Sequence, residues 1–281
     1  MVHRFFYATF IYKKPPLMDI VQSIIIGIVE GITEFIPISS TGHMIITEKL
    51  LGLQEDEFVK MFTIAIQLGA ILAVVVLYWK KFFDFKNLHF YFKLIIGVIP
   101  AIILGLLFSN KIDELLQSTT TVAYALLLGG IVLLFIDNFF NHPTIDSEKQ
   151  VTYSKSFTIG IWQCLAMVPG VSRSAASIIG GMQQKLTRSA AAEFSFFLAV
   201  PTMVAATGYK LFKFFRENGG LSHEEVKLLL IGNIVAFAVA LLAIKFFIEF
   251  LKKHGFRIWG IYRIIIGLIL LAMIYTGHIQ M

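Results

Sequence analysis

Two glutamates separated by one helical turn stand in an otherwise apolar stretch near the start of the chain. Glu30 and Glu34 are four residues apart, and in a helix this spacing places both carboxylates on one face. A charged side chain at membrane depth costs about 2.5–3.5 kcal/mol on insertion scales, and two like charges also repel. We therefore expect a compensating Mg²⁺ or Ca²⁺ ion, a shared proton or a water-filled cleft. The simpler alternative is an interfacial helix with both glutamates in water.

A run of hydroxyl side chains follows the two glutamates and ends in a histidine. Its residues are Ser39, Ser40, Thr41, Gly42 and His43. A serine or histidine becomes a nucleophile when a base lies beside it, and a helix N-terminus is itself an anion site. The alternative is an ordinary N-cap for a helix that starts near Met44.

A second polar segment contains an arginine that must be paired. The residues are Pro169, Gly170, Val171, Ser172, Arg173 and Ser174, with Ser177 one turn further on. A guanidinium cannot be neutralised, so at membrane depth it needs an anion. Hydroxyls and a helix N-terminus around one guanidinium favour a phosphate group. A structural ion pair between Arg173 and Glu30 or Glu34 is the alternative.

Two further polar residues stand within or beside apolar segments. Gln67 and Glu193 could face the same cavity as the motifs above, and Glu193 could equally mark an interface.

The composition requires a membrane protein to carry these motifs. Of 281 residues, 57% are hydrophobic and only 15% are charged, against about 25% charged in a soluble domain. The single cysteine, Cys164, excludes a disulfide framework. Six apolar runs are long enough to cross a bilayer: 61–79, 90–108, 122–140, 190–211, 226–250 and 258–275.

Two other apolar stretches, 18–53 and 156–184, are broken by proline, glycine and polar residues. Irregular backbone at membrane depth must be buried in protein or line a wet cavity, so we predict two re-entrant half-helix hairpins. Pro37 and Pro169 are 132 positions apart, and the same offset pairs Ser40 with Ser172. Each hairpin is followed by three spans, which predicts an inverted repeat with the hairpin tips meeting near the midplane.

The expected organisation is one all-α membrane domain over 18–281. It divides into repeat one (18–140), a connector (141–155) and repeat two (156–281), with residues 1–17 as an N-terminal extension outside the fold. The net charge of +6 comes from lysines and arginines in short connectors, which indicates membrane lipids as partners and no nucleic acid. The connectors near residues 80, 150, 185 and 253 are somewhat richer in them, which weakly favours that side as cytoplasmic.

Together, these motifs closely resemble the undecaprenyl-diphosphate phosphatases of the bacitracin-resistance family. The resemblance runs over most of the chain from Met18. It rests on the segments 30–35 (EGITEF), 39–43 (SSTGH), 66–69 (IQLG), 169–174 (PGVSRS) and 193–196 (EFSF). This chain has Ala175 and Ser177 where the family usually has glycine and threonine, which puts substrate positioning by that hydroxyl in doubt.

The resemblance implies hydrolysis of undecaprenyl diphosphate to the monophosphate and inorganic phosphate. This reaction would recycle a carrier lipid for cell-wall synthesis and give bacitracin resistance. It further implies a divalent-cation requirement and a bacterial plasma-membrane enzyme whose site opens to the outer face. The sequence does not decide between a monomer and a homodimer.

The predicted mechanism divides the work between the two segments. Arg173, with Ser172, Ser174 and Ser177, would bind the diphosphate together with Ser39 and Thr41, while a cation bridges it to Glu30 and Glu34. Ser40 is the expected nucleophile, with Glu34 or His43 as base and His43 as a candidate acid. Attack by water or by His43 itself stays open. The rival prediction is a secondary transporter or polyprenyl-phosphate flippase, since inverted repeats with broken helices are typical of transporters.

Overall fold

The computed structural model describes residues 18–53, 56–116 and 118–279. The predicted extension 1–17 lies outside the described residues. Within them the chain is helical, with one isolated bridge between Ile145 and Leu186. The elements run in the order α1 Ile20–Thr33, α2 Ser40–Leu50, α3 Glu57–Ala65, α4 Gln67–Leu77, α5 Trp79–Phe82, α6 Leu88–Leu107, α7 Ser109–Leu116, α8 Thr119–Phe139, η1 Glu148–Gln150, α9 Tyr153–Gln163, η2 Cys164–Met167, α10 Arg173–Gln183, α11 Arg188–Asn218, α12 His223–His254 and α13 Arg257–Tyr275.

The six predicted spans are confirmed as helices long and apolar enough to cross a membrane. In the described part of the chain they are 57–77, which combines α3 and α4, followed by α6, α8, α11, α12 and α13. Each has at least the 18 residues that a hydrocarbon core of about 30 Å demands. The all-helical membrane fold is therefore as the composition predicted.

The two broken stretches form short helices instead of spans. The first gives α1 and α2, of 14 and 11 residues, and the second gives α9, η2 and α10. Ser39 and Ser172 precede α2 and α10 with φ of 69° and 75°, a conformation that costs a non-glycine residue about 1–3 kcal/mol. These two serines are 133 positions apart, so the backbone matches Ser39, not Ser40, with Ser172.

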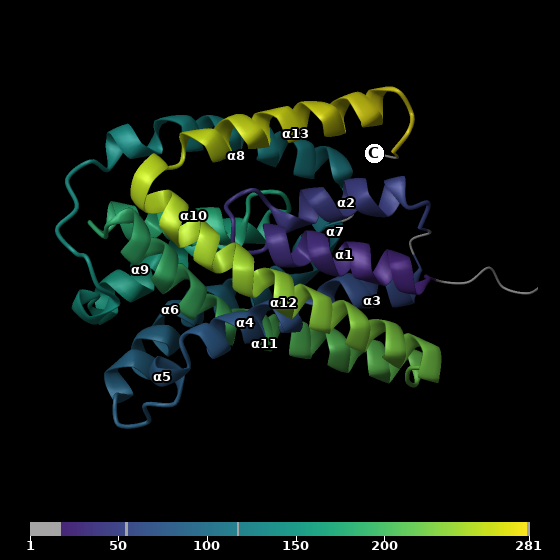
Figure 1. Ribbon diagram of the computed structural model, residues 1–281, viewed down its shortest axis with the longest axis horizontal. Coiled ribbons are helices and arrows are strands. Elements are labelled where there is room, and N and C mark those ends of the chain that lie inside the picture. Colours follow the sequence, from purple (N-terminus) through teal and green to yellow (C-terminus); the bar gives the residue numbers. More distant parts are fainter. Residues whose placement is uncertain (1–17, 54–55, 117, 280–281) are drawn as a thin grey trace, which may run out of the picture.

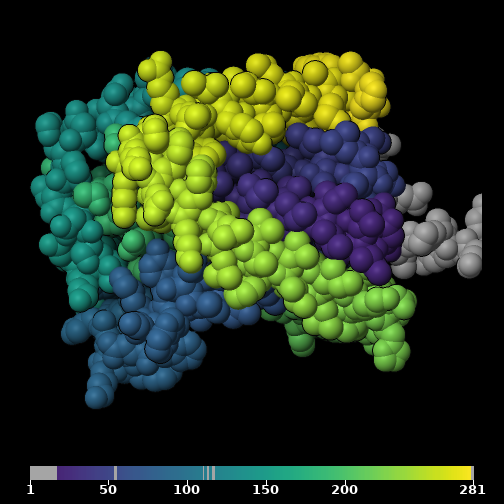
Figure 2. All heavy atoms as spheres, in the orientation of Figure 1, coloured from purple at the N-terminus to yellow at the C-terminus, as the bar shows by residue number. Residues whose placement is uncertain are grey.

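Figure 1 shows how the two pairs of short helices are placed. Along the long axis of the molecule, α1 and α2 lie toward one end, while α9 and α10 lie toward the other. Helices α8 and α13 run along one edge, and α1 packs against α12. On the face seen in Figure 2, α1 is exposed between α2 and α12.

Glycines allow the helices to approach closely enough to hold this arrangement. A Cβ on Gly160 of α9 would fall 2.1 Å from the Gly97 carbonyl oxygen of α6, and one on Gly130 of α8 would fall 2.8 Å from the Gly260 carbonyl oxygen of α13. Small residues at contacts are the usual means of packing helices in lipid, where burial of apolar surface gives little driving force.

Charged residues fasten the connectors at one end of the bundle. Asp137 at the end of α8 accepts hydrogen bonds from Arg188 Nε (2.5 Å) and from the Phe256 amide (2.7 Å). Lys81 forms an ion pair of 2.5 Å with Glu148 in η1. The contacts of Asp137 join the starts of α11 and α13 to the end of α8, and the ion pair of Lys81 joins α5 to η1.

Replacing Gly160 by alanine should destabilise the protein, because the new methyl group overlaps backbone of α6. Forced overpacking of this kind costs about 1–3 kcal/mol, so the thermal midpoint in detergent should fall. Gly208→Ala is the matched control, since a Cβ there meets no described atom within 4 Å. Equal midpoints for the two variants would contradict the close approach of α6 and α9.

Candidate active site

The turns before α2 and α10 are in direct contact. Ser174 Oγ donates a 2.7 Å hydrogen bond to the carbonyl oxygen of Phe35, and both groups are buried. We call residues 34–40 and 169–174 the two tips. Two segments that are 139 positions apart in sequence are therefore direct neighbours in the structure.

A single arginine of α13 joins both tips from behind. Arg263 is fully buried and, among the described residues, has carbonyl oxygens and no carboxylate as partners. The acceptors are Pro37 (3.2 Å), Val171 (2.9 Å), Gly170 (2.9 Å), Ala125 (3.0 Å) and Leu126 (3.4 Å). One guanidinium therefore donates to carbonyl groups of the first tip, the second tip and α8, and so joins these three parts of the chain.

Sequence reasoning missed Arg263 because the residue lies inside a span, next to Tyr262 and near Arg257 at its start. From the sequence alone, an arginine near the start of a span is interpreted as an anchor at the membrane interface. Its depth in α13, six residues after the helix begins, was the available signal, since charges inside spans mark functional or buried polar sites.

The first reactive group is a hydrogen-bonded chain of three side chains across the tips. Ser40 Oγ donates to Glu34 Oε2 at 2.7 Å, and Arg173 Nη2 binds Glu34 Oε1 at 3.3 Å. Glu34 is 7% exposed and Arg173 10% exposed. The glutamate thus orients a hydroxyl with one oxygen and holds the guanidinium with the other.

Glu30 lies beside this chain and can still accept a hydrogen bond or bind a cation. It is 1% exposed, and its Oε1 atom has no hydrogen-bond partner among the described residues. Two glutamates face one guanidinium, so a cluster with both carboxylates ionised carries one unit of uncompensated negative charge. A buried charge of this kind requires a proton or a cation.

The remaining contacts of Arg173 run to α11. Its Nη1 donates to the carbonyl oxygen of Ser195 at 3.1 Å, and Ser195 Oγ lies 2.6 Å from Ser177 Oγ. Ser174 and Ser177 are completely buried, with a solvent exposure of 0%. Their hydroxyls donate to backbone carbonyls, so their observed role is to hold the second tip. Sequence reasoning did not single out Ser195 as a site residue.

His43 lies one helical turn after Ser39 and bonds on both sides of its ring. Nδ1 is 2.8 Å from the Ser39 carbonyl oxygen, and Nε2 is 2.8 Å from the hydroxyl of Tyr262. The two rings are parallel within 4°. The structure therefore joins His43 to the residue beside Arg263.

The simple capping interpretation of the first hydroxyl run is wrong. Helix α2 begins at Ser40, four residues before the expected start, and among the described groups Ser39 forms no side-chain cap. Ser172 does cap α10, since its Oγ accepts from the Ala175 amide at 3.2 Å. Thr41 lies in the first turn of α2 and is half-buried.

Two further residues were predicted to face the same cavity, and among the described residues neither makes a hydrogen bond to the cluster. Gln67 begins α4, and within the described residues it makes no hydrogen bond to the cluster. The charges that act on Glu193 are those of Lys81, Glu148 and Lys252, which belong to the end of the bundle fastened by η1.

The cluster fits a cation that its substrate helps to bind. No group of three or more histidine, cysteine, aspartate or glutamate side chains suited to a metal occurs in the described ranges. Glu30 and Glu34 supply carboxylate oxygens, one of them unpartnered. Mg²⁺ is usually held by one or two carboxylates together with substrate phosphates and water, which is the donor set available here.

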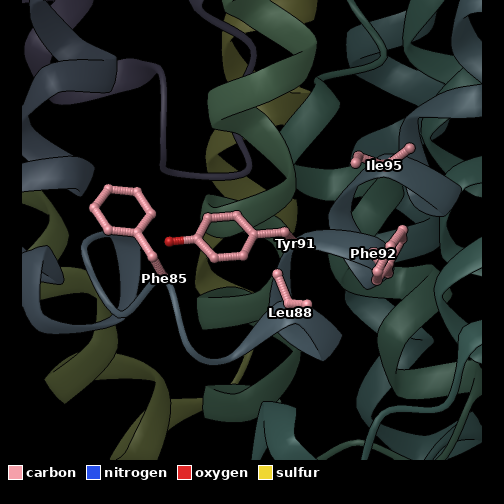
Figure 3. Close-up of a pocket in the computed structure, with 5 residues that line it drawn as sticks. All are labelled: Phe85, Leu88, Tyr91, Phe92 and Ile95. Atoms are coloured by element: carbon pink, nitrogen blue, oxygen red, sulfur yellow. The ribbon is translucent and has the colours of Figure 1, made fainter.

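An apolar hollow lies elsewhere in the described part of the chain. It has a volume of about 480 Å³ and is lined by Phe85, Leu88, Tyr91, Phe92 and Ile95, at the start of α6 and the turn before it (Figure 3). Its lining is apolar, and the Tyr91 hydroxyl is already donated to the Phe82 carbonyl. Phosphate chemistry therefore belongs to the tips and not to this hollow.

The fold and the cluster define a polytopic helical membrane protein with a buried group of two glutamates, a serine and an arginine. Residues 23–269 match the family described as bacitracin resistance protein BacA. The chain belongs to this family.

Similar proteins from several bacteria are described as undecaprenyl-diphosphatases. An undecaprenyl-diphosphatase of Flavobacterium psychrophilum is 58% identical over 261 residues, covering 93% of this chain and 98% of the relative. The undecaprenyl-diphosphatase of Flavobacterium johnsoniae is 55% identical with the same coverage. That of Porphyromonas gingivalis is 50% identical and covers 92% of this chain and 98% of its own.

Displacing Arg263 should separate the tips. In Gly129→Ala the new Cβ would fall 2.3 Å from Arg263 Nη2, so the guanidinium must move from its carbonyl partners. Each buried group left unpaired costs about 1–3 kcal/mol, and we expect a clear fall in the thermal midpoint with loss of activity. Gly105→Ala is the control, because a Cβ there meets only Met167 Cε at an ordinary 3.8 Å. A Gly129→Ala protein as stable and active as this control would contradict the role of Arg263.

Proposed function

We propose that the protein hydrolyses undecaprenyl diphosphate to undecaprenyl phosphate and inorganic phosphate, and so contributes to bacitracin resistance. The observation that carries the proposal is the Ser40–Glu34–Arg173 chain, which combines a nucleophile, a base and a phosphate-binding cation in one buried place. The described activity of the relatives supports it.

Ser40 is the nucleophile of the proposed reaction. Its Oγ attacks the terminal phosphorus while its proton passes to Glu34 Oε2, 2.7 Å away. The phosphoanhydride bond breaks, undecaprenyl phosphate leaves, and the phosphoryl group remains on Ser40. Of the two bases that the sequence left open, Glu34 is the one in contact with this hydroxyl.

The positive groups at the tips bind the diphosphate. Arg173 is fixed by Glu34 and Ser195, so its guanidinium is oriented before the substrate arrives. The first turn of α2 offers amide groups that, among the described residues, no side chain caps. Preorganised donors of this kind stabilise the charge that develops on a transferred phosphoryl group.

A divalent cation, with Mg²⁺ as our choice, completes the site. Glu30 and Glu34 would hold it together with phosphate oxygens of the substrate. When bound, it neutralises charge on the transferred group and on the leaving phosphate. The charge balance supports this: two carboxylates and one guanidinium alone would repel an anionic substrate, and a doubly charged cation reverses the sign.

The proposed setting is the bacterial plasma membrane, with the two tips as re-entrant hairpins of an inverted repeat. Support comes from the equal lengths of α2 and α10 and from the matching positive φ values at Ser39 and Ser172. The polyprenyl tail would lie on lipid-facing helix surfaces, where burial supplies affinity without specificity. The connectors richer in lysine and arginine favour the η1 end as cytoplasmic and a site open to the outer face.

The transporter alternative requires no nucleophile. A carrier does not need a serine hydroxyl that donates a hydrogen bond to a buried carboxylate, or a carboxylate that also holds the phosphate-binding arginine. The hydrogen-bonded chain and the relatives therefore favour the enzyme over a carrier for an intact lipid.

The test is phosphate release from undecaprenyl diphosphate by purified protein in detergent, with and without EDTA. Ser40→Ala, Glu34→Gln and Arg173→Ala should each reduce kcat at least about 100-fold, because each removes a group that acts in the transition state. EDTA should abolish release, and Mg²⁺ should restore it.

Exposed residues of the same types provide the controls. Glu217→Gln and Arg216→Ala lie at the exposed end of α11 and should leave release unchanged. Folded wild-type protein that releases no phosphate would refute the phosphatase, and full activity in Ser40→Ala would refute the serine nucleophile.

A further inference from the structure

The hydroxyl of Tyr262 lies where it can carry a proton to His43. Because the Ser39 carbonyl can only accept, the 2.8 Å contact to Nδ1 fixes the hydrogen of a neutral His43 ring on Nδ1. Nε2 is then the acceptor, and the Tyr262 hydroxyl at 2.8 Å must be the donor. The lone pair of His43 Nε2 therefore already accepts a hydrogen bond from the phenol of Tyr262.

This arrangement leaves His43 without direct access to a reacting group. Ser40 has its own base in Glu34, so His43 is not needed for the first half of the reaction. Any proton that reaches Nε2 must arrive through the Tyr262 oxygen, which keeps lone pairs free. Tyr262 is 37% exposed, so water can reach that oxygen.

The position of Tyr262 is set by its neighbour in sequence. Arg263 fixes α13 against both tips through five backbone carbonyl groups. The preceding residue is thereby held against α2, where the phenol and imidazole rings are parallel, with centroids 5.5 Å apart. The hydrogen bonds of Arg263 and the parallel rings together hold Tyr262 in one position beside His43.

We propose that Tyr262 is a catalytic residue that relays a proton from the hydrolytic water to His43 in the second half of the reaction. This inference rests on the proposed phosphatase activity. Water attacks the phosphorus on Ser40 and passes a proton to Tyr262 Oη, while the phenolic proton moves to His43 Nε2. The bond from phosphorus to Ser40 Oγ breaks, and Ser40 recovers its proton from Glu34. Phosphate then leaves, and His43 returns its proton to solvent.

The variant that tests the relay is Tyr262→Phe, which keeps the ring and removes the hydroxyl. We expect kcat to fall at least about 10-fold, as for loss of a general acid–base group. Because phosphorylation of Ser40 precedes the affected step, kcat/KM should stay unchanged and KM should fall with kcat. Rapid acid quenching with substrate labelled in the terminal phosphate should show phosphoserine accumulating at Ser40.

Two controls separate the relay from a structural effect. Tyr91→Phe also removes a tyrosine hydroxyl with a 2.8 Å hydrogen bond, to the Phe82 carbonyl, and should leave all three kinetic quantities unchanged. In a His43→Ala background, Tyr262→Phe should add no further loss, because the two residues act as one unit. A fall in kcat/KM equal to that in kcat, an unchanged kcat, or the absence of phosphoserine in every variant would overturn the relay.

A measurement without substrate keeps this inference distinct from the proposed function. Diethylpyrocarbonate modifies an unprotonated histidine nitrogen, and its rate at His43 can be followed by peptide mass spectrometry. Loss of one neutral hydrogen bond should raise the rate in Tyr262→Phe by about 2- to 10-fold. No change in rate would refute the hydrogen bond between Tyr262 and His43 and with it the relay. Absence of phosphate release by the wild type would refute the phosphatase and the relay that depends on it, and a raised rate in Tyr262→Phe would still establish the hydrogen bond.

Discussion

The site depends on one buried guanidinium that bonds to backbone from three parts of the chain. Arg263, itself fully buried, donates to carbonyl groups of both tips and of α8. Irregular backbone at membrane depth is tolerated only when its polar groups are paired within the protein. The broken segments can therefore approach each other because α13 supplies the donors that their turns lack.

Charge imbalance explains what such a site can do. Glu30 and Glu34 face a single Arg173, and one oxygen of Glu30 has no partner among the described residues. A fully paired cluster would be a structural ion pair and would have little reason to bind anything. The unpaired oxygen and the strained serines before α2 and α10 are the features expected of a site that holds a cation and an anionic substrate.

Several elements followed directly from the sequence. The six spans were predictable because length and apolar composition decide whether a segment can cross a bilayer. The contact of Arg173 with Glu34 was predictable because a charge that cannot be neutralised must find its opposite at depth. The start of α2 was not, because the four residues before Met44 suggested a turn. In the structure they form the first turn of α2, where Gly42 lies against Leu126 of α8. Periodicity does not say which end of a bundle Glu193 faces, and the charges that act on it are those of Lys81, Glu148 and Lys252.

The sequence by itself determined a membrane bundle, two interrupted segments and the residue types of an acid, hydroxyl and arginine site. These follow from the cost of placing polar groups in lipid, which acts on each segment separately. Only the tertiary structure decided that Ser40 bonds to Glu34, that the Tyr262 hydroxyl bonds to His43, and that Arg263 joins the tips. Those contacts span as many as 226 positions, and a distant pairing depends on how whole helices pack rather than on any local pattern.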